Sequence, residues 1–230
     1  MSGRQPKTND PRELPAYSIS EAAHYLAVPA ATIRYWSMGR DRYEPLIQVP
    51  RRVPTLLSFL NLTELHVLAA IRREHEVKMP SVRKAIQYLA ARAAGAMEKR
   101  HPLISHQLET DGLDLFIEQY GQLINISRAG QIAMRQVINA ALRRIDRDPA
   151  GVPVKLYPFT RSALEGTPAM IVIDPRLSAG RPVIAGTGLA TQLIAERYKA
   201  GESISDLAHD YEREHAEIEE AIRCELQAAA

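Results

Sequence analysis

The apolar residues of this chain recur at helical spacing in several separate stretches. The first of these stretches is YSISEAAHYLAVPAATIRYW, residues 17–36. Ser18 followed three residues later by Glu21 forms a capping box, which predicts a helix beginning at about Ser18. An Ala-Val-Pro stop ending at Pro29 closes that helix, and a proline without an amide hydrogen suits the first turn of a second helix over 30–36. Two short helices joined by such a turn predict a helix-turn-helix, with an ordinary helical hairpin as the alternative.

A β-hairpin and two longer helices are expected next. Two apolar runs, 46–49 and 56–59, flank the basic, proline-bounded segment PRRVP over 50–54. This arrangement predicts a hairpin with a basic tip. Apolar positions then recur with a helical period over 61–76 and again over 79–94, where they form a stripe of about four turns.

The middle of the chain carries weaker signals. An Asp-Gly pair at 111–112 predicts a hairpin turn between 103–109 and 113–123. The periodicity of 129–146 predicts a helix, and 152–159 predicts a strand. We expect a small α/β module that packs between the two ends, with strand edges that pair either within the chain or across a two-fold axis in a dimer.

The C-terminal part predicts two short strands followed by three helices. The strands fall within 170–175 and 180–188, and the helices within 191–200, from Ser203 onward, and within 216–227. The predicted fold class is therefore α+β: a winged helix-turn-helix, a small middle α/β module, and a C-terminal β-hairpin with a helix-turn-helix-like three-helix domain. The predicted boundaries are a mobile arm over 1–16 and domains over 17–100, 101–165 and 166–230.

The chain repeats part of its own sequence. SISEAAH at 18–24 and SISDLAH at 203–209 agree at five of seven positions, at an offset of 185 residues. Three exposed positions of the first copy correspond to glutamates in the second: Thr32, Arg34 and Tyr35 correspond to Glu217, Glu219 and Glu220. A second helix-turn-helix with carboxylates on its exposed face would repel phosphates, so this copy binds a protein or has no partner.

Composition limits the class of protein. With 230 residues, 46% hydrophobic and 24% charged, the chain suits an ordinary globular protein of one or two domains. No apolar run reaches ~18 residues and the N-terminus has no hydrophobic signal core, so we expect no membrane partner. We expect a cytoplasmic, nucleoid-associated protein, and the single cysteine, Cys224, which excludes an internal disulfide, suits the reducing cytoplasm.

Charge divides the chain into a basic front and an acidic end. Residues 1–100 hold 16 Lys and Arg against 9 Asp and Glu, whereas residues 201–230 hold 2 against 9. A basic front half suits contacts with nucleic-acid phosphates, and the acidic end requires a different partner. Solvated surface loops are the alternative interpretation of these charges.

The sequence offers no motif for catalysis. The seven histidines lack metal-ligand spacing, and Gly180 and Gly186 are too far apart for a phosphate-binding loop and are not followed by lysine. No nucleophile paired with a base is recognisable. We therefore expect a protein that is not an enzyme, with no catalytic residue, metal or cofactor.

Residues 17 to about 95 resemble the DNA-binding head of MerR-type regulators, and SISEAAHYLAVPAATIRYW carries the resemblance. The resemblance implies that Thr32, Arg34 and Tyr35 face DNA while Ile33 and Trp36 face the core. Four arginines around the predicted hairpin are further candidates for phosphate contacts: Arg40, Arg42, Arg51 and Arg52.

The segment IDPRLSAGRPVIAGTGLATQLIAERYKAGESISDLAHDYEREHAEIEEAIRCEL resembles a C-terminal domain of VapB-type antitoxins, a domain first classed as of unknown function. The family usually has Arg where this chain has Gly188, and Pro where it has Glu212. Together with the MerR-like head, this resemblance implies a homodimeric antitoxin that binds a PIN-like ribonuclease toxin and represses its own operon by binding operator DNA.

Four residues of the acidic end are candidates for toxin contact: Arg213, Arg223, Glu217 and Glu220. Surface salt bridges with neighbouring glutamates are the alternative role of the two arginines. A MerR-like regulator that responds to a small molecule or metal is the alternative function. A protein adaptor that no longer binds DNA is a third, which the basic head disfavours.

Overall fold

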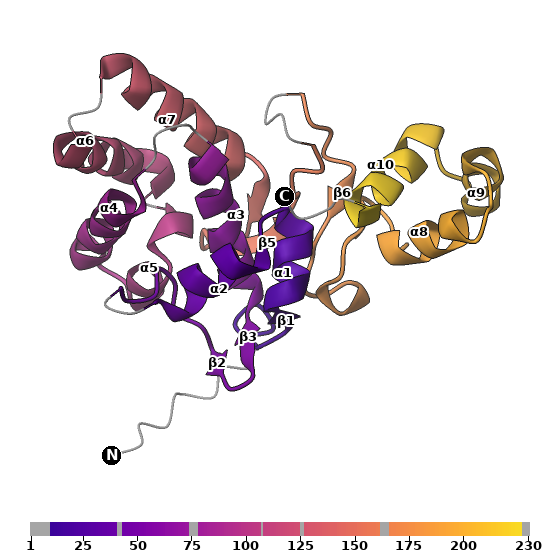
Figure 1. Ribbon diagram of the computed structural model, residues 1–230, viewed down its shortest axis with the longest axis horizontal. Coiled ribbons are helices and arrows are strands. Elements are labelled where there is room, and N and C mark those ends of the chain that lie inside the picture. Colours follow the sequence, from indigo (N-terminus) through magenta and orange to yellow (C-terminus); the bar gives the residue numbers. More distant parts are fainter. Residues whose placement is uncertain are drawn as a thin grey trace.

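The computed structural model describes residues 10–40, 43–73, 78–106, 108–124, 127–161 and 166–226, and within them the chain is an α+β protein (Figure 1). The helices are α1 (Ile19–Leu26), α2 (Ala30–Met38), α3 (Phe59–Arg73), α4 (Met79–Arg92), α5 (Ala96–Arg100), α6 (Leu113–Ile124), α7 (Arg128–Leu142), α8 (Thr191–Lys199), α9 (Ile204–Tyr211) and α10 (His215–Leu226). The strands are β1 (Tyr17–Ser18), β2 (Arg51–Arg52), β3 (Thr55–Leu57), β4 (Ile145–Arg147), β5 (Pro153–Leu156), β6 (Ile171–Val172) and β7 (Val183–Ile184).

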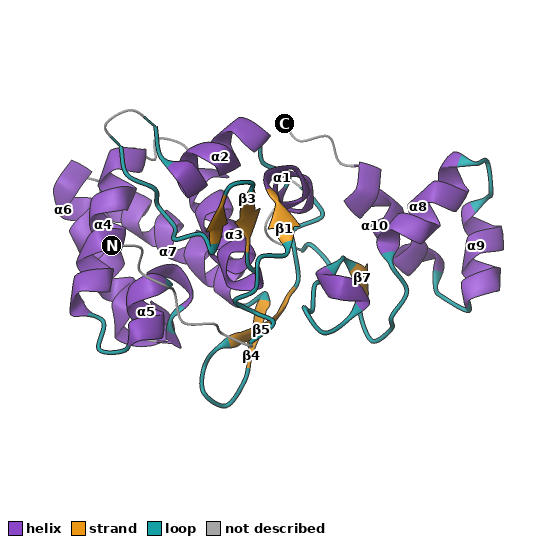
Figure 2. Ribbon diagram, turned by 90° about the horizontal axis from the view of Figure 1, so that it is seen from below, coloured by secondary structure: helices purple, strands orange, loops and turns teal. Residues whose placement is uncertain are grey.

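The molecule has a larger body and a smaller C-terminal module. Helices α1–α7 form the larger body around small antiparallel sheets, and α8–α10 project from one side of it (Figures 1 and 2). One continuous hydrophobic core runs from Tyr17 to Ile173, and a separate core joins Ile171 and Ile184 to the last three helices. Helix α1 lies where the two parts meet (Figure 2).

The first two helices are confirmed. The Ser18 hydroxyl accepts the Glu21 amide at 3.1 Å, and the Glu21 carboxylate accepts the Ser18 amide at 2.8 Å, which completes the capping box. Ala27 ends α1 in the left-handed conformation, with φ of 50°. Helix α2 then begins directly after Pro29, as the sequence predicts.

The hairpin lies later in the chain than its apolar runs predicted. The amides of Leu46 and Ile47 both donate to the Trp36 carbonyl, at 2.7 and 3.3 Å, so this run terminates α2 instead of pairing as a strand. The basic segment itself forms strand β2, which pairs with β3. Strand β3 is the middle strand of the sheet, because β1 pairs with its other edge.

Helix α3 runs through the centre of the larger body and is enclosed on every side. All of its residues from Phe59 to Ile71 are buried. Its start is fixed by a reciprocal pair of hydrogen bonds, in which Ser58 and Asn61 each accept the other's amide at 3.1 Å. A helix that is buried around its whole circumference needs neighbours on every side, and here the head and the middle helices supply them.

The hairpin predicted around Asp-Gly at 111–112 is wrong. Those two residues end a π-helical turn, Leu108–Gly112, that leads directly into α6. Four buried side chains follow at helical spacing: Leu113, Phe116, Ile117 and Tyr120. Burial of this face against the core outweighs the local turn preference of Asp-Gly.

The helix predicted over 129–146 is shorter than expected. Helix α7 ends at Leu142, and the chain then turns back as β4, which pairs antiparallel with β5. Strand β5 confirms a strand in the first half of the range predicted over 152–159. The Arg144 guanidinium donates to four backbone carbonyls, those of Tyr157, Pro158, Thr167 and Pro168, at 2.8 to 3.2 Å. These contacts draw the chain away from the helix axis.

The C-terminal elements are confirmed closely. Strands β6 and β7 pair with each other, and α8, α9 and α10 begin within one residue of their predicted starts. Gly201, with φ of 102°, follows α8 in the left-handed conformation that a helix end favours. Within the described residues, no helix combines the length and apolar character needed to cross a bilayer.

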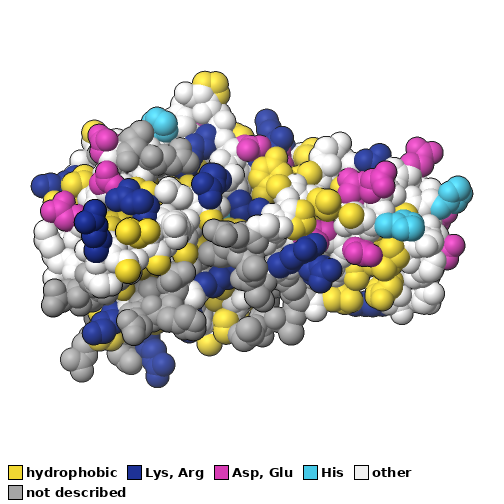
Figure 3. All heavy atoms as spheres, turned by 90° about the horizontal axis from the view of Figure 1, so that it is seen from above, with side chains coloured by type: hydrophobic (Ala, Val, Ile, Leu, Met, Phe, Trp, Pro, Cys, Tyr) yellow, Lys and Arg dark blue, Asp and Glu magenta, His cyan; other side chains and the backbone are white. Residues whose placement is uncertain are grey.

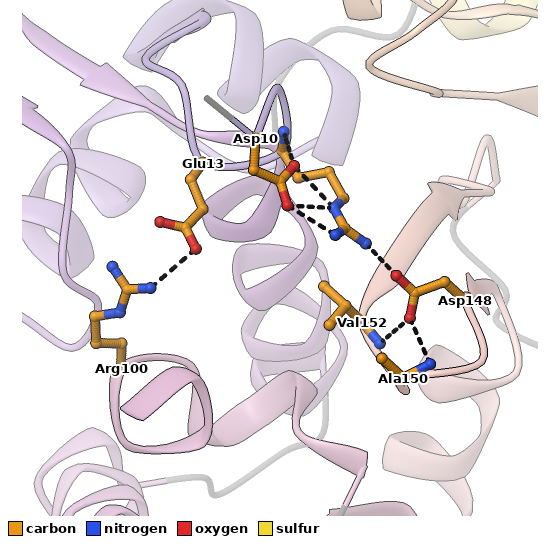
Figure 4. A network of polar contacts seen from close by, with 7 residues as sticks. Asp10, Glu13, Arg100, Asp148, Ala150 and Val152 are labelled. Atoms are coloured by element: carbon orange, nitrogen blue, oxygen red, sulfur yellow. Dashed lines mark hydrogen bonds and ion pairs between the residues drawn. The ribbon is translucent and has the colours of Figure 1, made fainter. Parts of the chain in front are cut away.

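Part of the segment predicted to be a mobile arm is fixed to the body (Figure 4). Arg12 donates to Asp10 at 2.7 Å and to Asp148, in the loop between β4 and β5, at 2.6 Å. Hydrogen bonding to Arg12 lowers the pKa of both carboxyl groups. Residues 10–16 are therefore anchored, and residues 1–9 lie outside the described part of the chain.

Replacement of Arg12 by methionine is expected to destabilise the fold by ~1 kcal/mol at about pH 7. A lowered carboxyl pKa adds stability above the unfolded-state value and loses it as the pH falls through the folded-state value. The difference between wild type and R12M should therefore shrink towards about pH 2, measured by chemical denaturation. R128M, which removes an exposed arginine of α7, is the control. An R12M deficit that is equal at both pH values would contradict the ion-pair explanation.

Candidate functional site

The outer side of α2 carries the residues that the MerR resemblance assigns to DNA. Arg34 is exposed, and Thr32 and Tyr35 are half-buried at the edge of the core. Ile33 and Trp36 are completely buried, as expected. Arg34 has no carboxylate partner among the described residues, so its charge is available to an external anion.

The hairpin lies beside the end of this helix. The Thr55 hydroxyl of β3 is 3.3 Å from the Met38 sulfur, the last residue of α2. Arg51–Arg52 on β2 are exposed, and Arg40 is exposed at the start of the loop that follows α2. These arginines therefore belong to the same region as Arg34, whereas Arg42 lies outside the described residues.

Helix α4 adds a residue to this region that the sequence pattern did not single out. The buried Arg83 guanidinium contacts the rings of Tyr35 and Tyr43, on α2 and on the loop after it. Arg83 follows Val82 in an otherwise ordinary amphipathic helix. The hydrophobic periodicity of that helix does not predict a contact between Arg83 and Tyr35, which lies 48 residues earlier in the chain.

The sequence repeat corresponds to a repeat in local structure. Helices α1 and α9 both have 8 residues, and the N-cap hydroxyls of Ser18 and Ser203 accept the amide three residues on at the same distance, 3.1 Å. The residues that end these helices, Ala27 and Glu212, have φ of 50° and 51°. Helices α2 and α10 begin at the same offset of 185 residues.

Burial agrees between the two copies as well. Ile33 and its counterpart Ile218 are both completely buried, as are Trp36 and its counterpart Ala221. The two helix pairs therefore share a backbone arrangement and an inner face but differ in charge outside. Figure 3 shows Asp, Glu and His side chains gathered at the end of the molecule formed by α9 and α10.

One of the three glutamates of the second copy is not on the surface, which corrects the expectation of an acidic triad. Glu220 is 1% exposed, and its carboxylate accepts hydrogen bonds from Thr160 and, at 2.8 Å, from Arg161. Burial raises the pKa of Glu220, but the hydrogen bonds from Arg161 and Thr160 outweigh this and leave the pKa below its usual range. Helix α10 packs here on the loop after β5, a contact that the repeat alone does not reveal.

The other candidate residues of the acidic end lie near the surface. Glu217 is half-buried and its carboxylate accepts the Glu214 amide at 3.0 Å, at the start of α10. Arg213 donates to the Tyr211 carbonyl at 3.4 Å. Arg223 is 46% exposed and lies 3.5 Å from the Glu220 carboxylate.

The C-terminal module contacts the head through α1 and β1. The Tyr17 hydroxyl, on a side chain that is 3% exposed, donates to the Gly180 carbonyl at 3.0 Å. Burial raises the pKa of Tyr17, so the hydroxyl keeps its proton and remains a donor. His24 of α1 lies 3.2 Å from the carboxylate of Glu225, on α10. The candidate DNA-facing helix pair and the C-terminal module are thus in direct contact.

The described residues hold no group of three or more His, Cys, Asp or Glu side chains placed to bind a metal ion. Burial raises the pKa of the Cys224 thiol, which keeps the thiol in its unreactive protonated form.

A comparison with known protein families matches residues 171–223 to a family described as "Protein of unknown function (DUF433)". The chain carries a DUF433 domain. This domain corresponds to β6, β7 and the three helices that follow, so it includes Gly180 at the contact with the head and most of the acidic helix pair.

Two curated proteins of Mycobacterium tuberculosis are similar to the chain well beyond the DUF433 domain. The protein named "Putative antitoxin VapB45" is 28% identical over 224 residues, covering 86% of this chain and 89% of the relative. The uncharacterized protein Rv2308 is 27% identical and covers 90% of this chain and 88% of its own length. The expected resemblance to a VapB-type antitoxin is confirmed by the DUF433 domain together with the first of these relatives.

A solved structure has a similar fold. The X-ray crystal structure of Rv2018 from Mycobacterium tuberculosis matches with a TM-score of 0.68 and 23% sequence identity. The match covers 91% of this chain and 98% of that one, so the larger body and the DUF433 domain have counterparts in one known molecule.

The contact between the head and the DUF433 domain should depend on the absence of a side chain at Gly180. An added Cβ would lie 2.4 Å from the Tyr17 hydroxyl oxygen, and φ is +79°. G180A is therefore expected to lower the free energy of unfolding by ~1–3 kcal/mol, measured by urea denaturation. Y17F removes that oxygen, so it should reduce the cost of G180A.

G188A is the matched control for this double-mutant cycle. A Cβ at Gly188 meets nothing within 4 Å, so its effect should stay within ~0.5 kcal/mol. If the losses in free energy of unfolding caused by G180A and Y17F were additive in the double variant, the two residues would not be coupled. The close approach of Tyr17 to Gly180 would then not explain the cost of G180A.

Proposed function

We propose that this chain is the antitoxin of a type II toxin–antitoxin system. Its C-terminal region, 166–230, binds and neutralises a PIN-like ribonuclease toxin. Its head, 17–100, acts as a winged helix-turn-helix that binds operator DNA and represses the operon, and the active form is a homodimer. The observation that carries the proposal is the similarity to VapB45 along most of both chains.

The charge and exposure of the head support operator binding. Arg34, Arg40 and Arg51–Arg52 are exposed around α2 and the hairpin. Each arginine that neutralises a phosphate releases a condensed counterion, which makes such a surface a favourable site for duplex DNA. A homodimer would present two such heads to two half-sites of an operator.

The acidic helix pair supports a protein partner for the DUF433 domain. The exposed Glu219 stands where the head has Arg34, so phosphates are repelled from a surface built on the same backbone. Arg213, Arg223 and Glu217 lie on or near this surface and are the proposed toxin contacts, while the buried Glu220 holds α10 in place. Neither the DUF433 match nor the relatives favour a regulator that responds to a small molecule or metal.

Replacement of Arg34 by alanine should weaken operator binding by ~1–3 kcal/mol, which is about 5- to 150-fold in affinity. The measurement is fluorescence anisotropy of the full chain with a duplex from the region upstream of its own gene, at several salt concentrations. R128A removes an exposed arginine of α7, on another part of the surface, and should bind like wild type. An unchanged affinity of R34A at matched salt would show that α2 does not read the operator.

Toxin neutralisation should depend on the other end of the chain. We expect the double variant R213A/R223A to need ~10-fold more protein than wild type to inhibit the nuclease encoded next to this gene, because arginine is enriched among the interface residues that contribute most to binding. The measurement is inhibition of purified nuclease on single-stranded RNA, with copurification as a second readout. R34A should inhibit like wild type. Full inhibition by a correctly folded R213A/R223A would place the toxin contacts elsewhere.

A further inference from the structure

Arg83 lies behind the candidate DNA-facing surface. It belongs to α4, outside the helix pair and the hairpin, and it is 9% exposed. Its guanidinium donates to the Glu44 carbonyl through Nη1 and lies 3.4 Å from the Tyr35 hydroxyl through Nη2. One buried side chain therefore contacts both α2 and the segment that leads from α2 to the hairpin.

The same guanidinium also contacts two aromatic rings. Its central carbon is 5.9 Å from the ring centroid of Tyr35 and 5.9 Å from that of Tyr43. A cation at this distance from a ring is attracted to the negative face of its π-system. The backbone of Tyr43 is also held by Arg40, because each residue donates its amide to the other's carbonyl, at 3.0 and 2.9 Å.

The two tyrosines form walls of a surface notch of about 620 Å³. Its lining residues are Ala31, Arg34, Tyr35, Gly39, Arg40 and Tyr43. Gly39 permits the loop to close on the helix, since a Cβ there would lie 2.4 Å from the Tyr43 carbonyl oxygen. The notch combines two arginines and two phenol rings, a set of groups suited to a phosphodiester.

We infer that Arg83 is a positioning residue for this notch: it holds Tyr35 and Tyr43 as the walls of a subsite that takes a backbone phosphate of DNA between Arg34 and Arg40. The inference rests on the proposed binding of DNA by the head. Arg83 is too buried to meet the phosphate and acts through the two tyrosines.

Packing alone does not explain an arginine at this position. The buried Nε of Arg83 has no hydrogen-bond partner in the part of the chain that the structure describes. An apolar side chain of similar length would fill the space without leaving a donor unpaired. A planar guanidinium can meet a carbonyl, a hydroxyl and two ring faces at once, which the ammonium group of lysine cannot.

The test compares R83M with K84M in the full chain. Lys84 is the exposed neighbour on the same helix, so K84M removes an equal charge without touching the notch. Affinity is measured by fluorescence anisotropy with a duplex from the region upstream of this gene, over a range of salt concentrations. R83M should bind ~10-fold more weakly, R83K should rescue little of this loss, and K84M should stay within about twofold of wild type.

The salt dependence separates positioning from direct contact. A residue that neutralises a phosphate itself lowers the slope of log affinity against log salt by ~1 when removed. R83M should leave that slope unchanged while lowering the affinity. A slope reduced by ~1 would make Arg83 a direct phosphate ligand and overturn the inference.

A double-mutant cycle with Tyr43 tests the route of the effect. If Arg83 acts in part by holding Tyr43, R83M should weaken binding by a smaller factor in a Y43A background than in the wild-type background. Full additivity of the two losses would overturn the inference.

Thermal melting followed by circular dichroism controls for folding. If R83M does not fold, the R83K variant and its double-mutant cycle with Y43A take the place of R83M in the test. Wild-type protein that fails to bind the duplex would refute DNA binding and this inference together, whereas an R83M variant that binds like wild type would refute the inference alone.

Discussion

Helix α3 is enclosed on every side, and the larger body is organised around it. A helix buried from Phe59 to Ile71 needs neighbours on every side, and the chain supplies them from the head and from the middle helices. Its buried Glu64 is paired inside, since its carboxylate lies 2.8 Å from the His101 ring nitrogen. The head is therefore one face of a larger core, which gives α2 and the hairpin a rigid support.

The two helix pairs show how one local design presents two different surfaces. Serine caps, left-handed end residues and matching buried positions such as Ile33 and Ile218 define the same backbone in both. The exposed positions are free to differ, because they contribute little to folding. Arginine at 34 and glutamate at 219 thus give the two ends opposite charge without changing how either end folds.

Contacts distant in sequence join the two ends into one molecule. Tyr17 meets Gly180, and His24 meets Glu225, so α1 supports α2 on one side and the DUF433 domain on the other. The carboxylate of Glu220 adds a buried link between α10 and the loop after β5. These contacts place the DUF433 domain directly against the helix on which the candidate DNA-facing surface rests.

Several features of this protein could be predicted from its residues alone. The cap at Ser18 and the stop at Pro29 were readable because each depends on neighbours within a few residues, and the charge asymmetry and the repeat at Ser203 follow from counting and comparing residues along the chain. Long-range packing produced the helix at 113–124, where burial of one face outweighs an Asp-Gly turn signal. It also decided the roles of Arg83 and Glu220, because their partners lie 39 to 60 residues away, and periodicity carries no information about such pairs.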